Sequence, residues 1–201
     1  MVSSAESAAA PELGVLIASV REGRSGAAIA EWFLDAARRH GGFRVNTLDL
    51  LEHPLPLLDE PRHPRLRQYA RDTTKSWSSL IEHMDAFAFV TPEYNFGSPP
   101  SLINALDHLF VEWNYKAVGF VSYGGISGGT RSVQMTKQVV TSLKMVPLFE
   151  AVAIPFFTTF IDPESKRFKA NESHERAAHA MLDELLRWTR ALASLRRPEA
   201  K

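Results

Sequence analysis

Five apolar segments, each followed by a helical pattern, constrain the fold of this chain more than any other feature of its sequence. Most of the segments are apolar on both faces, which is typical of parallel strands covered by helices on both sides. The second alternates, as an edge strand does. The segments are residues 13–18, 44–50, 86–90, 117–121 and 149–154. The helical patterns, with apolar residues three to four apart, are residues 26–40, 66–84, 101–110, 131–144 and 172–195.

This alternation predicts an α/β fold: a flavodoxin-like doubly wound five-stranded parallel sheet in the order 2-1-3-4-5, with helices on both faces. The 201 residues fit one domain. We expect it to span residues 12–195, between a disordered tail at 1–11 and a C-terminal tail at 196–201. In such a sheet, ligands bind beyond the carboxyl ends of the strands, so the loops after the first, third and fourth strands are the expected binding loops.

The composition excludes several functions. A chain without cysteine has no disulfide, zinc–thiolate site, iron–sulfur cluster or cysteine nucleophile. With 23 basic and 23 acidic residues, it lacks the positive surplus of a nucleic-acid-binding protein. The longest apolar stretch, residues 151–161, is shorter than the ~20 residues of a membrane helix. Because the N-terminus also lacks the pattern of a signal peptide, we expect a cytoplasmic protein with no membrane or nucleic-acid partner.

Two further patterns have plain explanations. The seven histidines lack metal-binding spacing. We also expect no acyl-transfer chemistry of the G-x-S-x-G type. We expect His174 and His179 to be solvated. A basic run is expected to form a solvated helix face, with contact to a partner or to a pyridine-nucleotide phosphate as the alternative. The run consists of Arg62, Arg65, Arg67 and Arg71.

The loop after the first strand, residues 19–26, combines two serines, two arginines and two glycines just before a helix start. Backbone N–H groups and the helix dipole favour an anion at such a position, and the guanidinium fork suits phosphate oxygens. The pattern is neither Walker A nor G-x-G-x-x-G. It therefore predicts a phosphate site, while a surface loop with an ordinary serine N-cap remains an alternative.

The loop after the third strand, residues 91–100, carries two aromatic side chains, an amide, a carboxylate and several prolines. A planar polar ligand needs this mixture of an apolar edge and fixed hydrogen-bonding groups. The alternative is a proline-rich connection whose aromatic residues fill the core.

The loop after the fourth strand, residues 122–131, contains four glycines among ten residues. So few side chains let the main chain approach a flat ring closely. Arg131 either contacts a second substrate or pairs with a carboxylate.

Three motifs together resemble the NAD(P)H-dependent FMN reductase family, over about residues 13–160. They are Ser19-x-Arg21; Thr91-Pro92-Glu93-Tyr94-Asn95 with Leu102-x-Asn104-Ala105-x-Asp107; and Ser122-x-Gly124-x-x-x-Gly128-Gly129-x-Arg131. Two positions depart from the family pattern. Ala18 replaces a glycine, which we expect to tighten the loop without abolishing phosphate binding, and Ile103 replaces a common lysine.

The resemblance implies an FMN site with no catalytic side chain and no metal. The residues implied to hold the phosphate are Ser19, Arg21, Arg24, Ser25 and Gly26. Those implied to border the isoalloxazine ring and the ribityl chain, mainly through backbone groups, are Pro92, Glu93, Tyr94 and Asn95. Those implied to flank the other side of the ring are Ser122, Tyr123, Gly124, Gly125 and Gly128.

The implied function is that of an FMN-dependent oxidoreductase, which takes a hydride from NADPH or NADH and passes two electrons to a small-molecule acceptor. The acceptor classes are a quinone, an azo dye, free flavin or a metal oxyanion. The resemblance also implies a homodimer or homotetramer, with Trp77 and Trp113 either at an interface or in the core. Two alternatives remain: a specialised FMN-dependent biosynthetic dehydrogenase, or a non-enzymatic flavodoxin-type electron carrier, against which the zero net charge argues.

Overall fold

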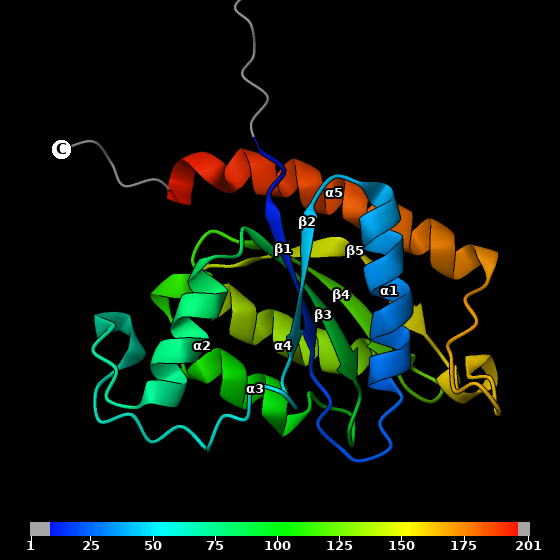
Figure 1. Cartoon of the computed structure of the whole chain (residues 1–201), viewed down its shortest axis with the longest axis horizontal. Coiled ribbons are helices and arrows are strands. Elements are labelled where there is room, and N and C mark those ends of the chain that lie inside the picture. The colour runs from blue at the N-terminus through cyan, green and yellow to red at the C-terminus, as the bar shows by residue number, and fades with distance from the viewer. Residues whose placement is uncertain (1–8, 197–201) are drawn as a thin grey trace, which may run out of the picture.

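Residues 9–196 are described by a computed structural model of the chain, in which one five-stranded sheet lies between two layers of helices (Figure 1). The strands are β1 (Glu12–Ile17), β2 (Arg44–Asp49), β3 (Ala86–Pro92), β4 (Ala117–Tyr123) and β5 (Val146–Ile154). All neighbouring strands are parallel, in the order β2-β1-β3-β4-β5. The predicted flavodoxin-like architecture is confirmed.

Each face of the sheet has its own apolar core. The helices are α1 (Gly26–His40), α2 (Asp72–Glu82), α3 (Pro100–Asp107), α4 (Thr130–Ser142) and α5 (Glu172–Arg196). One core joins α1 and α5 to the sheet, and the other joins α2, α3 and α4 to the opposite face. No helix in the described part of the chain is long and apolar enough to cross a membrane.

Strand β3 lies at the centre of both cores, because every one of its residues is buried. Phe87 and Phe89 point into the core under α2–α4, while the residues that alternate with them face α1 and α5; these are Ala86, Ala88 and Val90. Trp77 and Trp113 are 1% and 0% exposed, and Trp113 packs edge-on against Phe87. Both tryptophans therefore belong to the core of this chain and offer no surface for an interface.

The prediction of one long helix over residues 66–84 is wrong. A short 3-10 turn, Pro64–Leu66, ends at Arg67, whose φ of 52° lies in the left-handed region. The backbone N–H groups of Ala70 and Arg71 then donate to the carboxylate of Glu60 at 2.7 and 2.9 Å. This carboxylate replaces the carbonyl acceptors that a helix would need, so α2 begins only at Asp72.

Two predictions about polar side chains also fail. His174 is 6% exposed and packs between Phe160 and Phe168, so it is buried, and burial lowers the pKa of its imidazole. His179 is exposed, as expected. The basic run does not form a helix face, because it lies in the segment before α2, where Arg67 and Arg71 pair with Glu82 and Asp59.

The ends of the chain bear on the predicted domain boundaries. Helix α5 includes Arg196, one residue beyond the predicted end of the domain. Residues 1–8 and 197–201 lie outside the described residues, so the predicted tails remain predictions. Strand β5 begins three residues earlier than predicted and includes Pro147, which an edge strand tolerates.

Candidate functional site

A cavity of about 310 Å³ lies at the carboxyl edge of the sheet, where the loops after β1, β3 and β4 meet. This is the position that the strand order predicts for a ligand. Its lining includes most of the predicted site residues: Arg21, Arg24, Ser25, Pro92, Glu93, Tyr94, Tyr123, Gly124 and Gly125. Glu22, Gly23 and Phe157 also line it. Segments far apart in the sequence therefore form one site.

Arg24 fixes the first loop and has little charge left for a ligand. Its guanidinium binds the carboxylate of Asp49 at the end of β2 through both Nη atoms, one of them 2.6 Å from Oδ1. It also donates to the carbonyl oxygen of Ser19 at 2.5 Å. Both side chains of this pair are about nine-tenths buried. Arg24 also lines the cavity, so a phosphate contact from both arginines stays a prediction, with the charge of Arg24 already shared with Asp49.

Arg21 is the cation that remains. It is exposed, lines the cavity and makes no ion pair among residues 9–196. Its guanidinium carbon lies 5.8 Å from the centre of the Tyr94 ring, so it faces the loop after β3. Glu22 beside it opposes an anion, so phosphate binding here would depend on Arg21 together with backbone N–H groups.

The start of α1 supplies those groups. Ser25 is the N-cap residue, but its side chain makes no bond to the helix. The first turn is Gly-Ala-Ala-Ile, so no side-chain charge compensates the positive end of the helix dipole. A Cβ at Gly26 would collide with the hydroxyls of Ser19 and Tyr123. Glycine at this position lets the helix start close to the end of the sheet.

Tyr123 closes the floor of the site. It is 4% exposed, and its hydroxyl donates to Oγ of Ser19 at 3.2 Å. Desolvation raises the pKa of this phenol to about 12, so it stays neutral in ordinary buffers. Its ring packs edge-on against Phe157, at 5.1 Å between ring centres.

Glu93 ties the loop after β3 to the loop after β4. Its carboxylate accepts hydrogen bonds from Oγ of Ser127 at 2.7 Å, from the backbone N–H of Arg131 at 3.1 Å and from Nε of Arg131 at 2.7 Å. The expectation that Arg131 pairs with a carboxylate is confirmed. The carboxylate of Glu93 is thus bonded within the protein, and the residue lines the cavity.

Two glycines of the loop after β4 differ in the space that surrounds them. A Cβ added at Gly125 would meet nothing within 4 Å, so bare main chain faces open space there. Gly128 is buried, with a φ of +60°, and a Cβ would lie 2.9 Å from the backbone nitrogen of Pro155. Gly125 therefore leaves space that a ligand could fill, whereas Gly128 lets the loop pack closely against the end of β5.

Five predicted site residues are not on the cavity wall. They are Ser19, Gly26, Asn95, Ser122 and Gly128. Ser19 and Ser122 are 1% exposed, and Oγ of Ser122 donates to the carbonyl oxygen of Gly128 at 2.8 Å. Asn95 is exposed in the turn that follows Tyr94. Most of these residues support the wall from behind.

Asn104, in the motif at the start of α3, holds the proline-rich loop after β2. Its Nδ2 donates to the carbonyl oxygen of Pro56 at 2.8 Å, and its Oδ1 accepts from the backbone N–H of Leu58 at 3.0 Å. His108 contacts the same carbonyl at 3.0 Å. This part of the motif positions a loop and does not touch the cavity.

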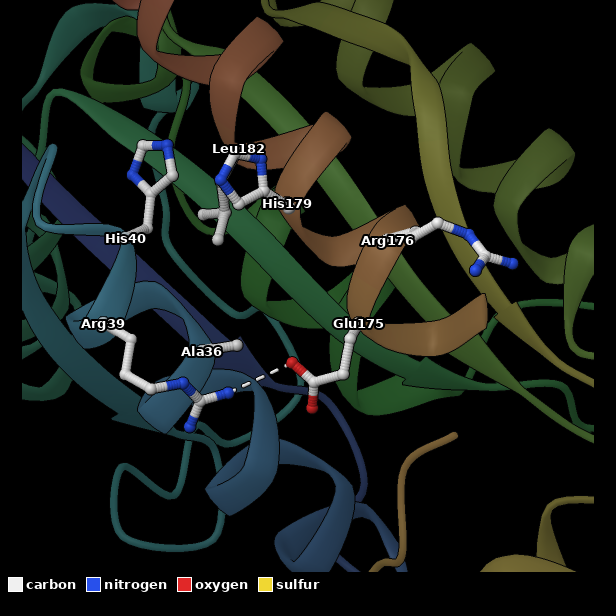
Figure 2. A pocket seen from close by; sticks show the side chains of 7 residues that line it. All are labelled: Ala36, Arg39, His40, Glu175, Arg176, His179 and Leu182. Atoms are coloured by element: carbon white, nitrogen blue, oxygen red, sulfur yellow. Dashed lines mark hydrogen bonds and ion pairs between the residues drawn. The ribbon is translucent and has the colours of Figure 1, made fainter. Parts of the chain in front are cut away.

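A second cavity, of about 420 Å³, lies between α1 and α5, away from the strand ends (Figure 2). Arg39 of α1 and Glu175 of α5 bridge it with an ion pair of 3.1 Å. Arg39 and its neighbours Arg176 and His179 are mostly exposed, and no group of three metal-ligand side chains forms among the described residues. The geometry therefore favours the cavity at the strand ends.

The tie made by Glu93 predicts a pH effect on stability. Desolvation acts to raise the pKa of Glu93, but hydrogen bonds from Arg131 and Ser127 hold it below its ordinary value. Such a carboxylate stabilises the fold fully above the pKa of an unfolded glutamate, about 4.3, and loses this contribution as pH falls through the lower folded pKa. We expect Glu93→Gln to lose less stability than wild type between pH 6 and pH 3. Urea titrations at each pH measure this, and equal losses would contradict it.

Comparison with known proteins identifies the family. Residues 11–159 match the NADPH-dependent FMN reductase family. An NAD(P)H-dependent FMN reductase of Schizosaccharomyces pombe is 42% identical over 149 residues, which cover 72% of this chain and 74% of that protein. One of Nectria sp is 30% identical over 151 residues, or 72% of this chain and 75% of that protein.

Solved structures agree on the fold. A flavoenzyme NAD(P)H:(acceptor) oxidoreductase from Paracoccus denitrificans matches with a TM-score of 0.70 at 18% identity, covering 90% of this chain and 98% of that one. The resemblance stated from the three motifs is confirmed by the family match and by the relative in fission yeast. The chain belongs to the NADPH-dependent FMN reductase family.

Proposed function

We propose that the cavity at the strand ends holds FMN, and that NAD(P)H and the electron acceptor react there in turn. Family membership makes the protein an FMN-dependent oxidoreductase that uses NAD(P)H; the site residues and the order of reaction are our proposals. The observation that carries them is the meeting of three loops of matching chemistry around one cavity.

The residues present fit FMN. At one end, Arg21, Ser25 and the N–H groups of the α1 start would hold the phosphate dianion. On one side, the backbone from Pro92 to Tyr94 would border the ring. On the other, the bare main chain at Gly125, where a Cβ would meet nothing within 4 Å, leaves room for a flat ring to lie close.

The side chains of this site would bind the flavin and orient it. When bound, FMN supplies the redox chemistry, taking a hydride from NAD(P)H, which is oxidised, and passing two electrons to the acceptor, which is reduced. The tie between Glu93, Ser127 and Arg131 would keep the two walls at a fixed separation. Tyr123, neutral and buried, would close the floor to water.

The proposed order of reaction predicts ping-pong kinetics. In this proposal both substrates reach the flavin through the open mouth of the cavity, and they cannot occupy it together. Double-reciprocal plots at several fixed acceptor concentrations should give parallel lines. Intersecting lines, with product inhibition typical of a ternary complex, would contradict this order.

Rapid mixing with NADPH tests the function itself. The purified protein, with FMN added if it emerges colourless, should bind FMN tightly and show bleaching of the flavin absorbance on the timescale of turnover. Bound FMN that NADPH does not bleach would indicate the electron-carrier alternative instead.

We also propose a homodimer or homotetramer. The exposed leucines of the segment after β2 offer apolar surface for it, with Leu51 and Leu57 at 52% and 82% exposed. Sedimentation velocity at two protein concentrations measures the assembly, and a monomer at both would contradict the proposal.

A cytoplasmic location is proposed on the ground that NAD(P)H is supplied inside cells and that the chain has no cysteine to oxidise. Cell fractionation tests it, and recovery of the protein outside the cytoplasmic fraction would contradict it.

A further inference from the structure

Two exposed phenylalanines lie within two residues of the cavity lining in the sequence. Phe96 is 70% exposed and Phe156 is 56% exposed. Each belongs to a loop that lines the cavity, since Tyr94 lies two residues before Phe96, and Phe157 directly follows Phe156. An exposed aromatic side chain close to a binding cavity offers a large, rigid contact area to a ligand.

Both residues hold a backbone conformation that phenylalanine rarely adopts. Their φ angles are +67° and +48°, in the left-handed region. Phe96 is the second central residue of a tight turn, in which Tyr94 and Gly97 exchange backbone hydrogen bonds of 3.0 and 2.9 Å. Glycine is the preferred residue at that position of such a turn. Strain of this kind persists mostly where function uses it.

The ring of Phe96 is held in place. The guanidinium carbon of Arg131 lies 3.8 Å from the ring centre, and Nε of Arg131 donates to Glu93 at 2.7 Å. Because Glu93 also lines the cavity, the ring is fixed relative to the site. A fixed, exposed aromatic ring loses little freedom when another flat ring stacks against it.

We propose that Phe96 and Phe156 are specificity-determining residues that hold planar aromatic electron acceptors at the mouth of the cavity. This inference rests on the proposed function. It concerns binding: the two rings favour flat aromatic acceptors over small inorganic ones, and they take no part in electron transfer.

Steady-state kinetics of the FMN-loaded protein with NADPH test this, using menadione as the flat acceptor and ferricyanide as the inorganic one. Phe96→Gly removes the ring and suits the positive φ. We expect the KM for menadione to rise about three- to tenfold, or about 0.7–1.4 kcal/mol, with kcat within twofold and the KM for ferricyanide unchanged. Phe96→Trp should restore the KM, and Phe156→Gly should shift it in the same direction.

Phe149→Ala is the matched control, because Phe149 is 91% exposed but lies on the edge strand β5, away from the binding loops. It should change neither KM. Equal effects of Phe96→Gly on both acceptors, no effect, or failure of the tryptophan variant would overturn the inference. If Phe96→Gly or Phe156→Gly changed the oligomeric state relative to wild type in sedimentation velocity, the rings would belong to a subunit interface, and the inference would be overturned. A wild-type protein that does not oxidise NADPH would contradict the proposed function as well, whereas an active one without the selective shift contradicts this inference alone.

Discussion

Replacing Arg21 with alanine should weaken FMN binding by one to two decades and leave riboflavin binding nearly unchanged. FMN carries a phosphate dianion, and riboflavin does not. A hydrogen bond to a charged group is worth about 1.5–3 kcal/mol, and ~1.4 kcal/mol corresponds to a tenfold change in Kd. Because Arg24 is already paired with Asp49, it cannot easily replace the lost charge. Isothermal titration of both flavins against both proteins measures the difference.

The control is Arg38→Ala, which removes another exposed arginine, at the far end of α1, where it pairs with Asp35. It should change neither affinity. Equal losses for FMN and riboflavin in the Arg21 variant would mean that the arginine supports the loop. No loss for either flavin would place the phosphate elsewhere.

Replacing Gly128 with valine should destabilise the fold by about 2–5 kcal/mol. A β-branched residue is strained at a φ of +60°, and its Cβ would press on the backbone of Ile154 and Pro155 at 2.9–3.2 Å. The motif alone suggests a residue beside the ring, whose replacement would affect FMN and spare the fold. The contacts of Gly128 instead predict that its replacement lowers the stability of the fold first, whether or not FMN is bound. Urea unfolding of the protein without flavin measures it.

Gly125→Ala is the matched comparison within the same loop. Its Cβ would meet no atom within 4 Å, so the free energy of unfolding should change by less than about 0.5 kcal/mol. Because the new methyl group enters the space of the proposed ring, FMN affinity should fall. A stable Gly128→Val variant, or an unstable Gly125→Ala variant, would show that the two glycines have been assigned the wrong roles.

The fold follows from the sequence where the signal is long and periodic. The uninterrupted apolar run of β3 and the stripe of α1 both form as predicted. The error over residues 66–84 has a local cause: apolar spacing cannot reveal that the carboxylate of Glu60 captures the N–H groups of Ala70 and Arg71.

The sequence predicts which loops form the candidate site, but it predicts less well what each residue of those loops does. Nothing in the first loop shows that Arg24 has a partner 25 residues away, because Asp49 ends a strand that contributes no binding motif. Phe157 was missed because it follows the last strand, after a proline. The aromatic pair next to Pro155, at the carboxyl end of a strand, was the signal that could have revealed it.

The ties between loops have a consequence for how the cavity takes up its ligand. Arg24 with Asp49, Tyr123 with Ser19, and Glu93 with Ser127 each join segments that would otherwise move independently. A site whose walls are already joined has little conformational entropy left to lose on binding. The affinity for the flavin would then depend on the contacts it makes, and amide hydrogen exchange in these loops would be slow before the flavin arrives as well as after.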